Sequence, residues 1–510
     1  MYLQIISTFV KIFKVKTMIH FSDRVVNEKA LEHAVKRCRE QKIIFPTFEQ
    51  QRHPELIPDK IKDKLKNVGL WDINPLNLFR ITWKNEPKEK GGLFGKPNYF
   101  ELPTEFTGVK ARIILMVGKY FPTGAHKVGA AYGCLAPRII TGEFDPTYHK
   151  AVWPSTGNYC RGGAFDSRLM GTEPIAILPQ EMSQERFDWL RNVVKSTVIA
   201  TPGSESNVKE IYDKCWELKR TRNDVVIFNQ FDEFGNAAWH YNITGQAIEE
   251  IFELTKDKNT QLAAYVSATG SAGTIAAGDY LRTLVPHVKV VASEALQCPT
   301  LLRNGFGAHR IEGIGDKHVP WIHNSKNTDA VSAIDDEDTM RLLRLFNDPE
   351  GQKYLRSIGF DKELIATLPL MGISSIANLL SAIKTAKYYE MTGDDMIVTV
   401  ATDSIDMYQS RLIELESERG NYTAYDAAAD YSSCILGQQT DNMRELGYQD
   451  QKAIHNLKYF TWVEQQAKEV EDLNTLWYDR EIWSKLFNQI KVWDELINEF
   501  NDRVGLLKKL

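Results

Sequence analysis

The sequence has little cysteine and lacks the residue spacing that is typical of metal sites. Its six cysteines are scattered over 510 residues, with no CxxC and no pairing pattern. Its eleven histidines show no HExxH or comparable ligand spacing. Scattered, unpaired cysteines are typical of a reducing compartment. We therefore expect a cytoplasmic protein without a structural metal.

The sequence also lacks a long apolar run and an excess of positive charge. Its net charge of −5 gives no reason to expect a nucleic-acid partner. The first 17 residues are apolar with Lys11, Lys14 and Lys16 interleaved, which reverses the order of a signal peptide. The apolar run is too short to span a bilayer, so we expect no membrane association. We expect Met18 to be the natural start and residues 1–17 an upstream read-through; an amphipathic surface helix is the alternative.

The length and the alternation of patterns predict an α/β protein. A chain of 510 residues exceeds the usual size of one hydrophobic core, so we expect two or more domains. Helical patterns separate the strand-like runs, which indicates parallel sheets covered by helices on both faces. The strand-like runs are 175–178, 197–200, 225–228, 262–266, 288–292 and 397–401.

Lys127 is the most informative single residue. An apolar run at 111–117 predicts a buried strand, and the Ala- and Gly-rich run 128–137 predicts a tightly packed helix. A Pro-Thr-Gly turn joins them, so Lys127 falls in the first helical turn at the lip of a sheet. A lysine is most often a solvated surface charge. The motifs that follow downstream favour a functional amine instead.

The first of these motifs is Ser155-Thr156-Gly157-Asn158, which follows a short apolar run. Hydroxyls, an amide and free backbone N–H groups at the start of a helix make an anion site suited to a carboxylate. An ordinary helix N-cap is the alternative, since Ser, Thr and Asn are the usual capping residues.

The second motif is Thr269-Gly270-Ser271-Ala272-Gly273-Thr274, between a predicted strand and a predicted helix. Small residues let the backbone approach an anion closely, and the N–H groups at a helix start favour phosphate. It is not a Walker loop, because no Gly-Lys-Ser/Thr follows, and its glycine spacing is not the dinucleotide fingerprint. The third motif, 396–404, is a strand that ends in Asp403-Ser404.

Together these motifs resemble the fold-type II pyridoxal-phosphate enzymes, the family of cysteine synthase, threonine dehydratase and tryptophan synthase β. The resemblance covers residues 100 to 412 in unbroken order, and its elements are closest to cysteine synthase. The matching elements are Glu101-Leu102-Pro103-Thr104, Gly124-Ala125-His126-Lys127, Ser155 to Asn158, Gly270 to Thr274, His309-Arg310-Ile311-Glu312-Gly313-Ile314-Gly315, Gly372-Ile373-Ser374-Ser375 and Asp403-Ser404.

The resemblance implies pyridoxal 5'-phosphate as cofactor and assigns residue roles. Lys127 is expected to form the Schiff base and then to take the substrate's Cα proton, and Ser404 to face the pyridine nitrogen, with Asp403 pointing away. His126, beside Lys127, is a candidate contact of the phosphate. The remaining assignments are Gly270, Ser271, Ala272, Gly273 and Thr274 for the phosphate, Asn158 for the phenolic oxygen, and Ser155, Thr156, Gly157, Asn158 and Gln230 for the substrate.

The resemblance also implies an architecture: two α/β domains with twisted parallel sheets facing each other across a cleft, and a homodimer. We expect the lysine and the substrate loop in a smaller domain, and the phosphate loop in a larger one. The expected divisions are an N-terminal extension at 1–90, a smaller domain at 112–232, a larger domain at 233–412 to which 91–111 contributes, and a helical C-terminal extension at 413–510.

Three functions remain open. The first is β-replacement on a small amino acid through an aminoacrylate, as in cysteine synthase. The second is β-elimination of the ammonia-lyase or desulfhydrase type, which the altered loop at 159–163 and the missing Gly-Glu-Arg after Ser404 allow. The third is a non-catalytic partner protein that kept the fold; retention of Lys127 and the phosphate loop argues against it.

Overall fold

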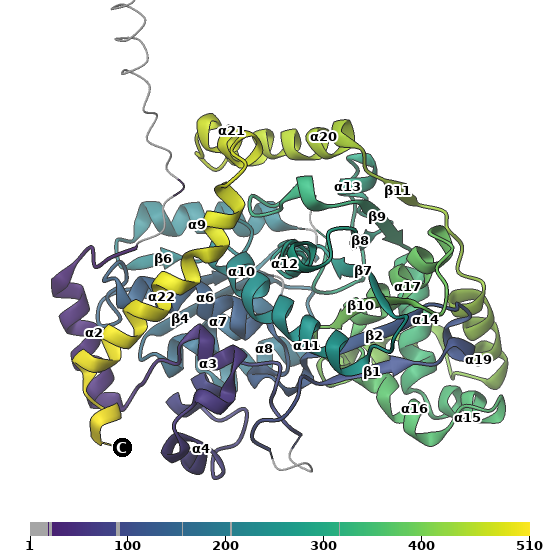
Figure 1. The fold of residues 1–510 in the computed structure, drawn as a ribbon, viewed down its shortest axis with the longest axis horizontal. Coiled ribbons are helices and arrows are strands. Elements are labelled where there is room, and N and C mark those ends of the chain that lie inside the picture. Colours follow the sequence, from purple (N-terminus) through teal and green to yellow (C-terminus); the bar gives the residue numbers. More distant parts are fainter. Residues whose placement is uncertain are drawn as a thin grey trace, which may run out of the picture.

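The chain forms two β-sheets joined by closely packed helices (Figure 1). The computed structural model describes residues 19, 23–87, 92–155, 157–204, 207–315 and 317–509. Residues 1–17, expected to be a read-through, lie outside the described residues. The helices of the described part are α2 Glu28–Gln41, α3 Phe48–Arg52, α4 Asp59–Leu65, α5 Thr104–Thr107, α6 Lys127–Ile140, α7 Asn158–Leu169, α8 Gln184–Asp188, α9 Val208–Thr221, α10 Phe234–Trp239, α11 Gly245–Thr255, α12 Ala277–Leu284, α13 Thr300–Arg303, α14 Asp336–Asn347, α15 Pro349–Ser357, α16 Lys362–Thr367, α17 Ile373–Tyr388, α18 Gln409–Arg419, α19 Ala424–Asp430, α20 Tyr448–Lys458, α21 Val470–Tyr478 and α22 Ile482–Val504.

The smaller sheet is parallel and is covered on both faces. Val152 and Ile177 pack with Ile211 of α9, whereas their neighbours Trp153 and Leu178 belong to the core that α7 shares. This alternation follows from the two-residue period of a strand. In order across the sheet, the strands are β5 Thr197–Thr201, β4 Glu173–Pro179, β3 Lys150–Pro154 and β6 Val225–Ile227.

The larger sheet has five parallel inner strands and an antiparallel strand at each edge. Helix α17 packs on one face, where Ile376 and Leu380 meet Ile113 and Ile397. Near-continuous apolar strands are typical of parallel sheets buried on both faces. In order across the sheet, the strands are β1 Tyr99–Leu102, β2 Arg112–Val117, β10 Asp395–Ala401, β7 Gln261–Ala268, β8 Lys289–Ala295, β9 Ala330–Ile334 and β11 Met443–Glu445.

Two boundaries differ from the expected division. Strand β2 pairs with β1 and β10, so 112–117 belong to the larger sheet and not to the smaller unit expected at 112–232. The strand precedes Lys127 directly in the chain, but its hydrogen-bond partners come from distant segments, and pattern alone does not identify them. The C-terminal extension, expected to be helical, also supplies β11, which pairs with β9.

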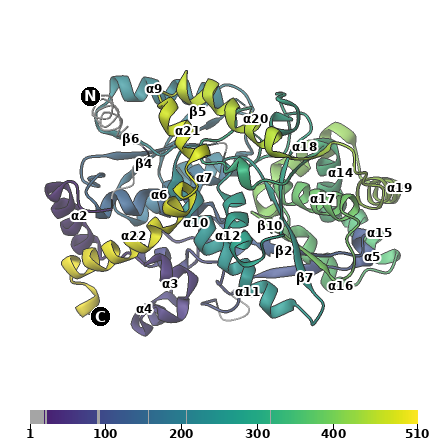
Figure 2. The same ribbon diagram turned by 45° about the horizontal axis from the view of Figure 1, so that its top comes forward.

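The two extensions pack together against the core. Helix α22 crosses α10 and α6 and ends beside α2, as both ribbon views show (Figures 1 and 2). Asn501 of α22 accepts a hydrogen bond from the Phe45 amide at 3.1 Å and donates one to the Phe45 carbonyl at 2.8 Å. Asp494 accepts from the Phe48 amide at 2.5 Å. The N-terminal extension is therefore held between the core and α22.

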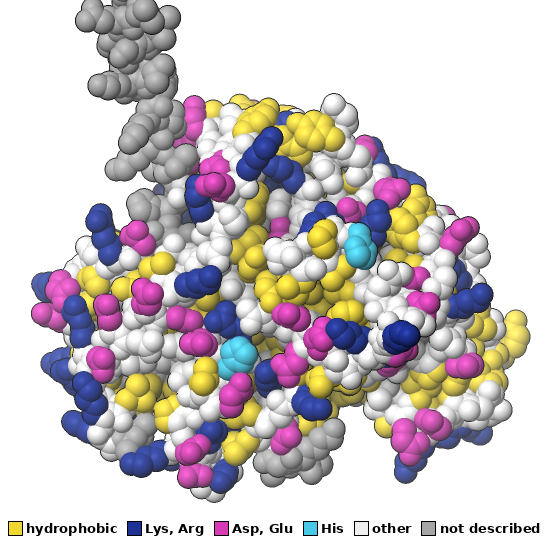
Figure 3. Space-filling model, viewed as in Figure 1, with side chains coloured by type: hydrophobic (Ala, Val, Ile, Leu, Met, Phe, Trp, Pro, Cys, Tyr) yellow, Lys and Arg dark blue, Asp and Glu magenta, His cyan; other side chains and the backbone are white. Residues whose placement is uncertain are grey.

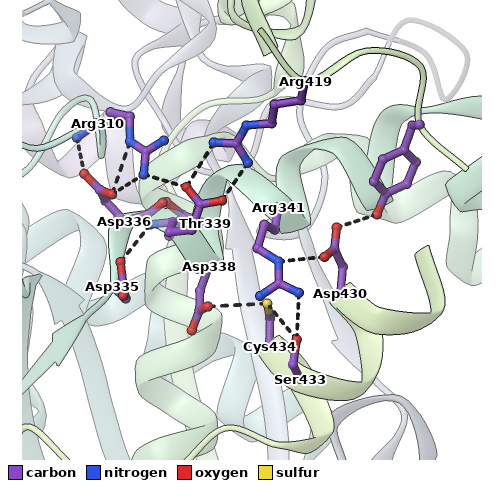
Figure 4. A network of polar contacts seen from close by, with 12 residues as sticks. Arg310, Asp335, Asp336, Asp338, Thr339, Arg341, Arg419, Asp430, Ser433 and Cys434 are labelled. Carbon is purple, nitrogen blue, oxygen red and sulfur yellow. Dashed lines mark hydrogen bonds and ion pairs between the residues drawn. The ribbon is translucent and has the colours of Figure 1, made fainter. Parts of the chain in front are cut away.

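A second group of contacts fastens the C-terminal extension to the segment 309–315 (Figure 4). Arg310 pairs with Asp336 at 2.6 Å and with Glu337 at 2.8 Å, and Glu337 also binds Arg419 of α18 at 2.6 Å. Arg341 of α14 binds Asp430 of α19 at 2.6 Å. The network therefore holds a segment that carries part of the family resemblance.

The surface shows charges of both signs without a continuous patch of either on the face drawn in Figure 3. Within the described residues, no single helix is long and apolar enough to cross a bilayer; only the pair Lys362–Leu370 and Ile373–Tyr388, bent by 115°, meets the length and composition test when taken together. All six cysteines are free and buried.

We predict that Asn501→Ala destabilises the protein, because it leaves the buried amide and carbonyl of Phe45 without partners. Each unsatisfied buried group costs about 1–3 kcal/mol. Chemical and thermal unfolding should show a lower midpoint than that of the wild type. Asn488→Ala is the matched control, since Asn488 lies on the exposed face of the same helix. Equal midpoints for the two variants would contradict a stabilising role of the hydrogen bonds between Asn501 and Phe45.

Candidate active site

Lys127 begins α6, directly after a tight turn. Thr123 and Gly124 both have left-handed backbone angles, φ 71° and 73°, and a side chain at Gly124 would lie 2.8 Å from the ring of Trp71. The Lys127 amine donates to the Ser271 hydroxyl at 3.3 Å. Burial lowers the pKa of Lys127 to about 8, because a low-dielectric surrounding disfavours the charged form. The neutral share of this amine at pH 7 is therefore much larger than that of an ordinary lysine, although the charged form still predominates.

His126 lies beneath this lysine and is fully buried. Its Nε2 lies 3.3 Å from the Thr402 hydroxyl, and its ring packs against those of Trp83 at 5.4 Å and His240 at 4.9 Å. Burial and the Lys127 charge hold the pKa of His126 well below its usual range. The imidazole is therefore neutral. Sequence reasoning missed Trp83 and His240, which come from distant segments.

The predicted phosphate loop, 270–274, joins β7 to α12 through one turn of 3-10 helix. Within the described residues, nothing accepts a hydrogen bond from the amides of Gly270, Ser271 or Ala272. A side chain at Gly273 would lie 2.0 Å from Asn236, whose amide donates to the Ser271 hydroxyl at 3.1 Å and to the Gln230 carbonyl at 3.0 Å. The loop thus offers free N–H donors, held in place by a side chain that sequence reasoning missed.

Thr274 closes this loop and contacts a histidine. Its hydroxyl lies 3.5 Å from Nε2 of His240, whose Nδ1 lies 2.8 Å from the Thr244 hydroxyl. Burial holds the pKa of His240 well below its usual range. The imidazole that contacts the phosphate loop is therefore neutral and adds no positive charge there.

The predicted substrate residues meet at the end of β3. Gln230 donates through Nε2 to the Ser155 hydroxyl at 3.2 Å, and the Gly157 amide donates to the same hydroxyl at 3.2 Å. Gln230 and Ser155, 75 residues apart, are thereby brought together. Thr156 lies outside the described residues.

Asn158 contacts a residue that was not expected in the site. Its Nδ2 donates to Asp403 at 2.7 Å, and the Tyr408 hydroxyl donates to the same carboxylate oxygen at 2.7 Å. The Asp403 side chain is buried and turns toward the substrate loop; whether it points away from the pyridine ring, as expected, stays a prediction. Ser404 follows as a residue only 2% exposed. Thr402, two residues earlier, lines the cavity beside Lys127.

That cavity is small. It has a volume of about 10 Å³ and is lined by Lys127, Ser271, Gly313, Thr402 and neighbouring residues, which is room for about one water molecule. A larger cavity of about 570 Å³ lies between α6, α9 and the C-terminal extension, and neither Lys127 nor the phosphate loop lines it. The chemistry is assigned to the smaller one, because Lys127 and the phosphate loop line it.

The donor set nevertheless fits pyridoxal phosphate. The free amides at 270–272 suit a phosphate, and a buried amine of lowered pKa beside them suits an aldehyde. Within the described residues, no group of three or more His, Cys, Asp or Glu side chains could hold a metal ion.

Comparison with known proteins agrees with this fit. The chain is 29% identical to a probable cysteine synthase of Bacillus subtilis over 305 residues, 59% of this chain and 89% of the relative. It is 25% identical to cystathionine beta-synthase of Saccharomyces cerevisiae over 382 residues, 72% and 71% of the two chains.

Solved structures share the fold. An O-acetylserine dependent cystathionine beta-synthase from Helicobacter pylori matches with a TM-score of 0.52 and 22% identity, over 62% of this chain and 95% of its own. A hydrogen sulfide-producing enzyme from Fusobacterium nucleatum matches with a TM-score of 0.51 and 24% identity, over 63% and 88%.

The family model described as pyridoxal-phosphate dependent enzyme matches residues 95–352. The match spans half of the chain and includes the lysine turn, the substrate loop and the phosphate loop. The protein therefore belongs to the pyridoxal-phosphate dependent enzymes.

Proposed function

We propose that the protein carries out β-replacement on a small amino acid, with Lys127 as its catalytic residue. The contact between the Lys127 amine and the Ser271 hydroxyl, at 3.3 Å, carries this proposal. It places a buried amine of lowered pKa against the loop proposed for the cofactor phosphate. The named relatives, a probable cysteine synthase and a cystathionine beta-synthase, support the reaction class.

When bound, pyridoxal phosphate supplies an aldehyde that reacts with amines and a ring that withdraws electrons from the substrate. The chain's residues would position that chemistry. The amides of Gly270, Ser271 and Ala272 would bind the phosphate, with Gly273 and Thr274 completing the loop. Neutral His126, beneath the lysine, would add no positive charge to it.

The substrate loop would orient the amino acid. Ser155, Gln230 and the Gly157 amide form one cluster suited to a carboxylate. Lys127, once neutral, would take the Cα proton and hold it at Nζ, which is general base catalysis. Ser404 would face the ring nitrogen, where a hydroxyl cannot hold a positive charge as a carboxylate does. Such a ring favours fast loss of a β substituent.

β-Elimination is the second candidate. Ile405 and Asp406 follow Ser404 where cysteine synthases have Gly-Glu-Arg, and one neighbour in fold is described as a hydrogen sulfide-producing enzyme. We further propose a homodimer in the cytoplasm; the six free cysteines support a reducing compartment.

A product assay tests the reaction. The holoenzyme is incubated with serine, O-acetylserine, O-phosphoserine, cysteine or diaminopropionate, with and without sulfide. We expect a new amino acid to exceed keto acid when sulfide is present, and Lys127→Ala to lower both by at least about 100-fold, the usual scale for a lost general base. Keto acid as the main product in every arm would identify an eliminating enzyme. A cofactor-loaded protein that converts none of these substrates would refute both.

We predict that the cofactor-free protein captures pyridoxal phosphate faster as pH rises, with the rate half-maximal near pH 8 and level about one pH unit above it. The reason is that only the neutral amine reacts, and burial lowers the pKa of Lys127 to about 8. The rate is followed by absorbance, and borohydride reduction with peptide mapping identifies the labelled lysine. A rate that climbs steadily to pH 10, or a label elsewhere, contradicts the assignment.

We predict that Gly273→Ala weakens cofactor binding by about 10-fold or more, an energy of about 1.4 kcal/mol. The new methyl group would lie 2.0 Å from Asn236, whose side-chain amide donates hydrogen bonds to the Ser271 hydroxyl and the Gln230 carbonyl. Equilibrium titration with pyridoxal phosphate measures the effect. Gly393→Ala is the control, because its nearest neighbour would be 4.0 Å away. Equal affinities for the two variants would mean that the phosphate lies elsewhere.

A further inference from the structure

Arg161 is a buried cation that forms no salt bridge with the described residues. Its residue is 1% exposed, and its only hydrogen bond among the described residues runs from Nη1 to the Met407 sulfur at 2.9 Å. Its Nε and Nη2 have no partner there. The guanidinium lies over the rings of Trp189 at 4.6 Å and Trp71 at 5.4 Å.

The surroundings compensate this charge only in part, through the electrostatic interaction with Asp403. Burial and Arg186 lower the pKa of Arg161 to about 10, so it stays charged at neutral pH. Cation–π contacts contribute about 0.5–2 kcal/mol, whereas a buried ion without a partner costs several kcal/mol. A sulfur atom is a weak acceptor. An anion bound to the guanidinium would lower the free-energy cost of burying Arg161.

The nearby carboxylates of the chain are already engaged. Asp403 accepts from Asn158 and Tyr408. Glu312 forms ion pairs with Arg186 and with Arg411, the second at 2.6 Å. Within the described residues, no carboxylate lies within 4.0 Å of Arg161, so a directly paired anion would have to be supplied by a ligand.

Arg161 lies beside the proposed site. It follows Asn158 by three positions on α7, and residues at this spacing share one face of a helix. The next residue, Gly162, packs on the start of α6, where an added Cβ would lie 3.0 Å from the Lys127 carbonyl carbon. Met407, which accepts its hydrogen bond, follows Ser404 by three residues. Arg161 is therefore one helical turn from Asn158, and its side chain contacts the segment that follows Ser404.

We propose that Arg161 selects amino-acid substrates whose β substituent carries a negative charge, such as a carboxylate, sulfonate or phosphate. The inference rests on the proposed function, because it places that β substituent in the site of Lys127. Arg is suited to such groups, since its planar fork binds them through two parallel hydrogen bonds. The rings of Trp71 and Trp189 lie against the guanidinium, and its Nε and Nη2 have no hydrogen-bond partner among the described residues. A β ammonium group, as in diaminopropionate, is disfavoured by like charge.

The test compares the binding of L-aspartate and L-asparagine to the cofactor-loaded protein. The two are nearly isosteric and differ in charge, and neither carries a leaving group on Cβ, so binding is measured without turnover. Calorimetry and the change in cofactor absorbance give both dissociation constants. We expect the wild type to bind aspartate at least 10-fold more tightly, with cysteate and O-phosphoserine showing which anion fits best.

Arg161→Met should bring the ratio of the two dissociation constants close to one, and Arg161→Lys should keep part of the preference. Arg344→Met is the control: Arg344 is also a buried arginine over an aromatic ring, Tyr422 at 4.8 Å, but it belongs to α14 outside the site. It should leave the ratio unchanged.

A wild type that binds asparagine as tightly as aspartate overturns the proposal, even where Arg161→Met protein does not fold. So does an aspartate preference that survives in folded Arg161→Met protein. If Arg161 has only a structural role between the two tryptophans, the wild type will bind asparagine as tightly as aspartate, and Arg161→Met will lower the melting temperature. Failure of the proposed function is distinct: the loaded protein then converts no β-substituted amino acid, whatever its charge.

Discussion

The close packing of α6 against two other helices is the constraint on which the rest of the structure depends. Helix α6 leaves the larger sheet after β2 and runs beneath the smaller one, with nearly all its residues buried. An added Cβ at Gly133 would lie 2.5 Å from the Gly235 carbonyl of α10, and one at Gly162 of α7 would lie 2.8 Å from Val128. Only residues without side chains permit these approaches. Because Lys127 begins this helix, the same packing determines where its amine lies.

The sequence predicts this region well because its signals are local. The apolar run, the turn and the small-residue helix around Lys127 adjoin one another, and the structure has β2, the turn and α6 there. Sheet membership of β2 could not be predicted, because β10 lies nearly 280 residues downstream. Trp71 and Trp83 could not be placed either: both reach the lysine turn from an extension whose pattern shows helices only. The contact between Asp403 and Asn158 could not be predicted from strand alternation, because β10 ends at Ala401, before Asp403.

The electrostatics of the site follow from burial more than from charge pairing. Desolvation lowers the pKa of Lys127, His126 and His240 alike, so the wall near the phosphate loop is largely neutral. The buried charges lie on the other side, around Asn158, where Arg161 and Arg186 face Asp403 and Glu312. Because the side near the phosphate loop is neutral, backbone N–H groups would bind the phosphate. The charged side chains lie on the side that would meet the substrate.

The charged side of the site also joins the two units. Asn158 and Arg186 belong to the unit of the smaller sheet, whereas Asp403 and Glu312 follow strands of the larger one, so their contacts span the two units. Buried polar groups are costly to leave without partners. These contacts therefore stabilise the substrate loop in its position beside the segments that follow the strands of the larger sheet.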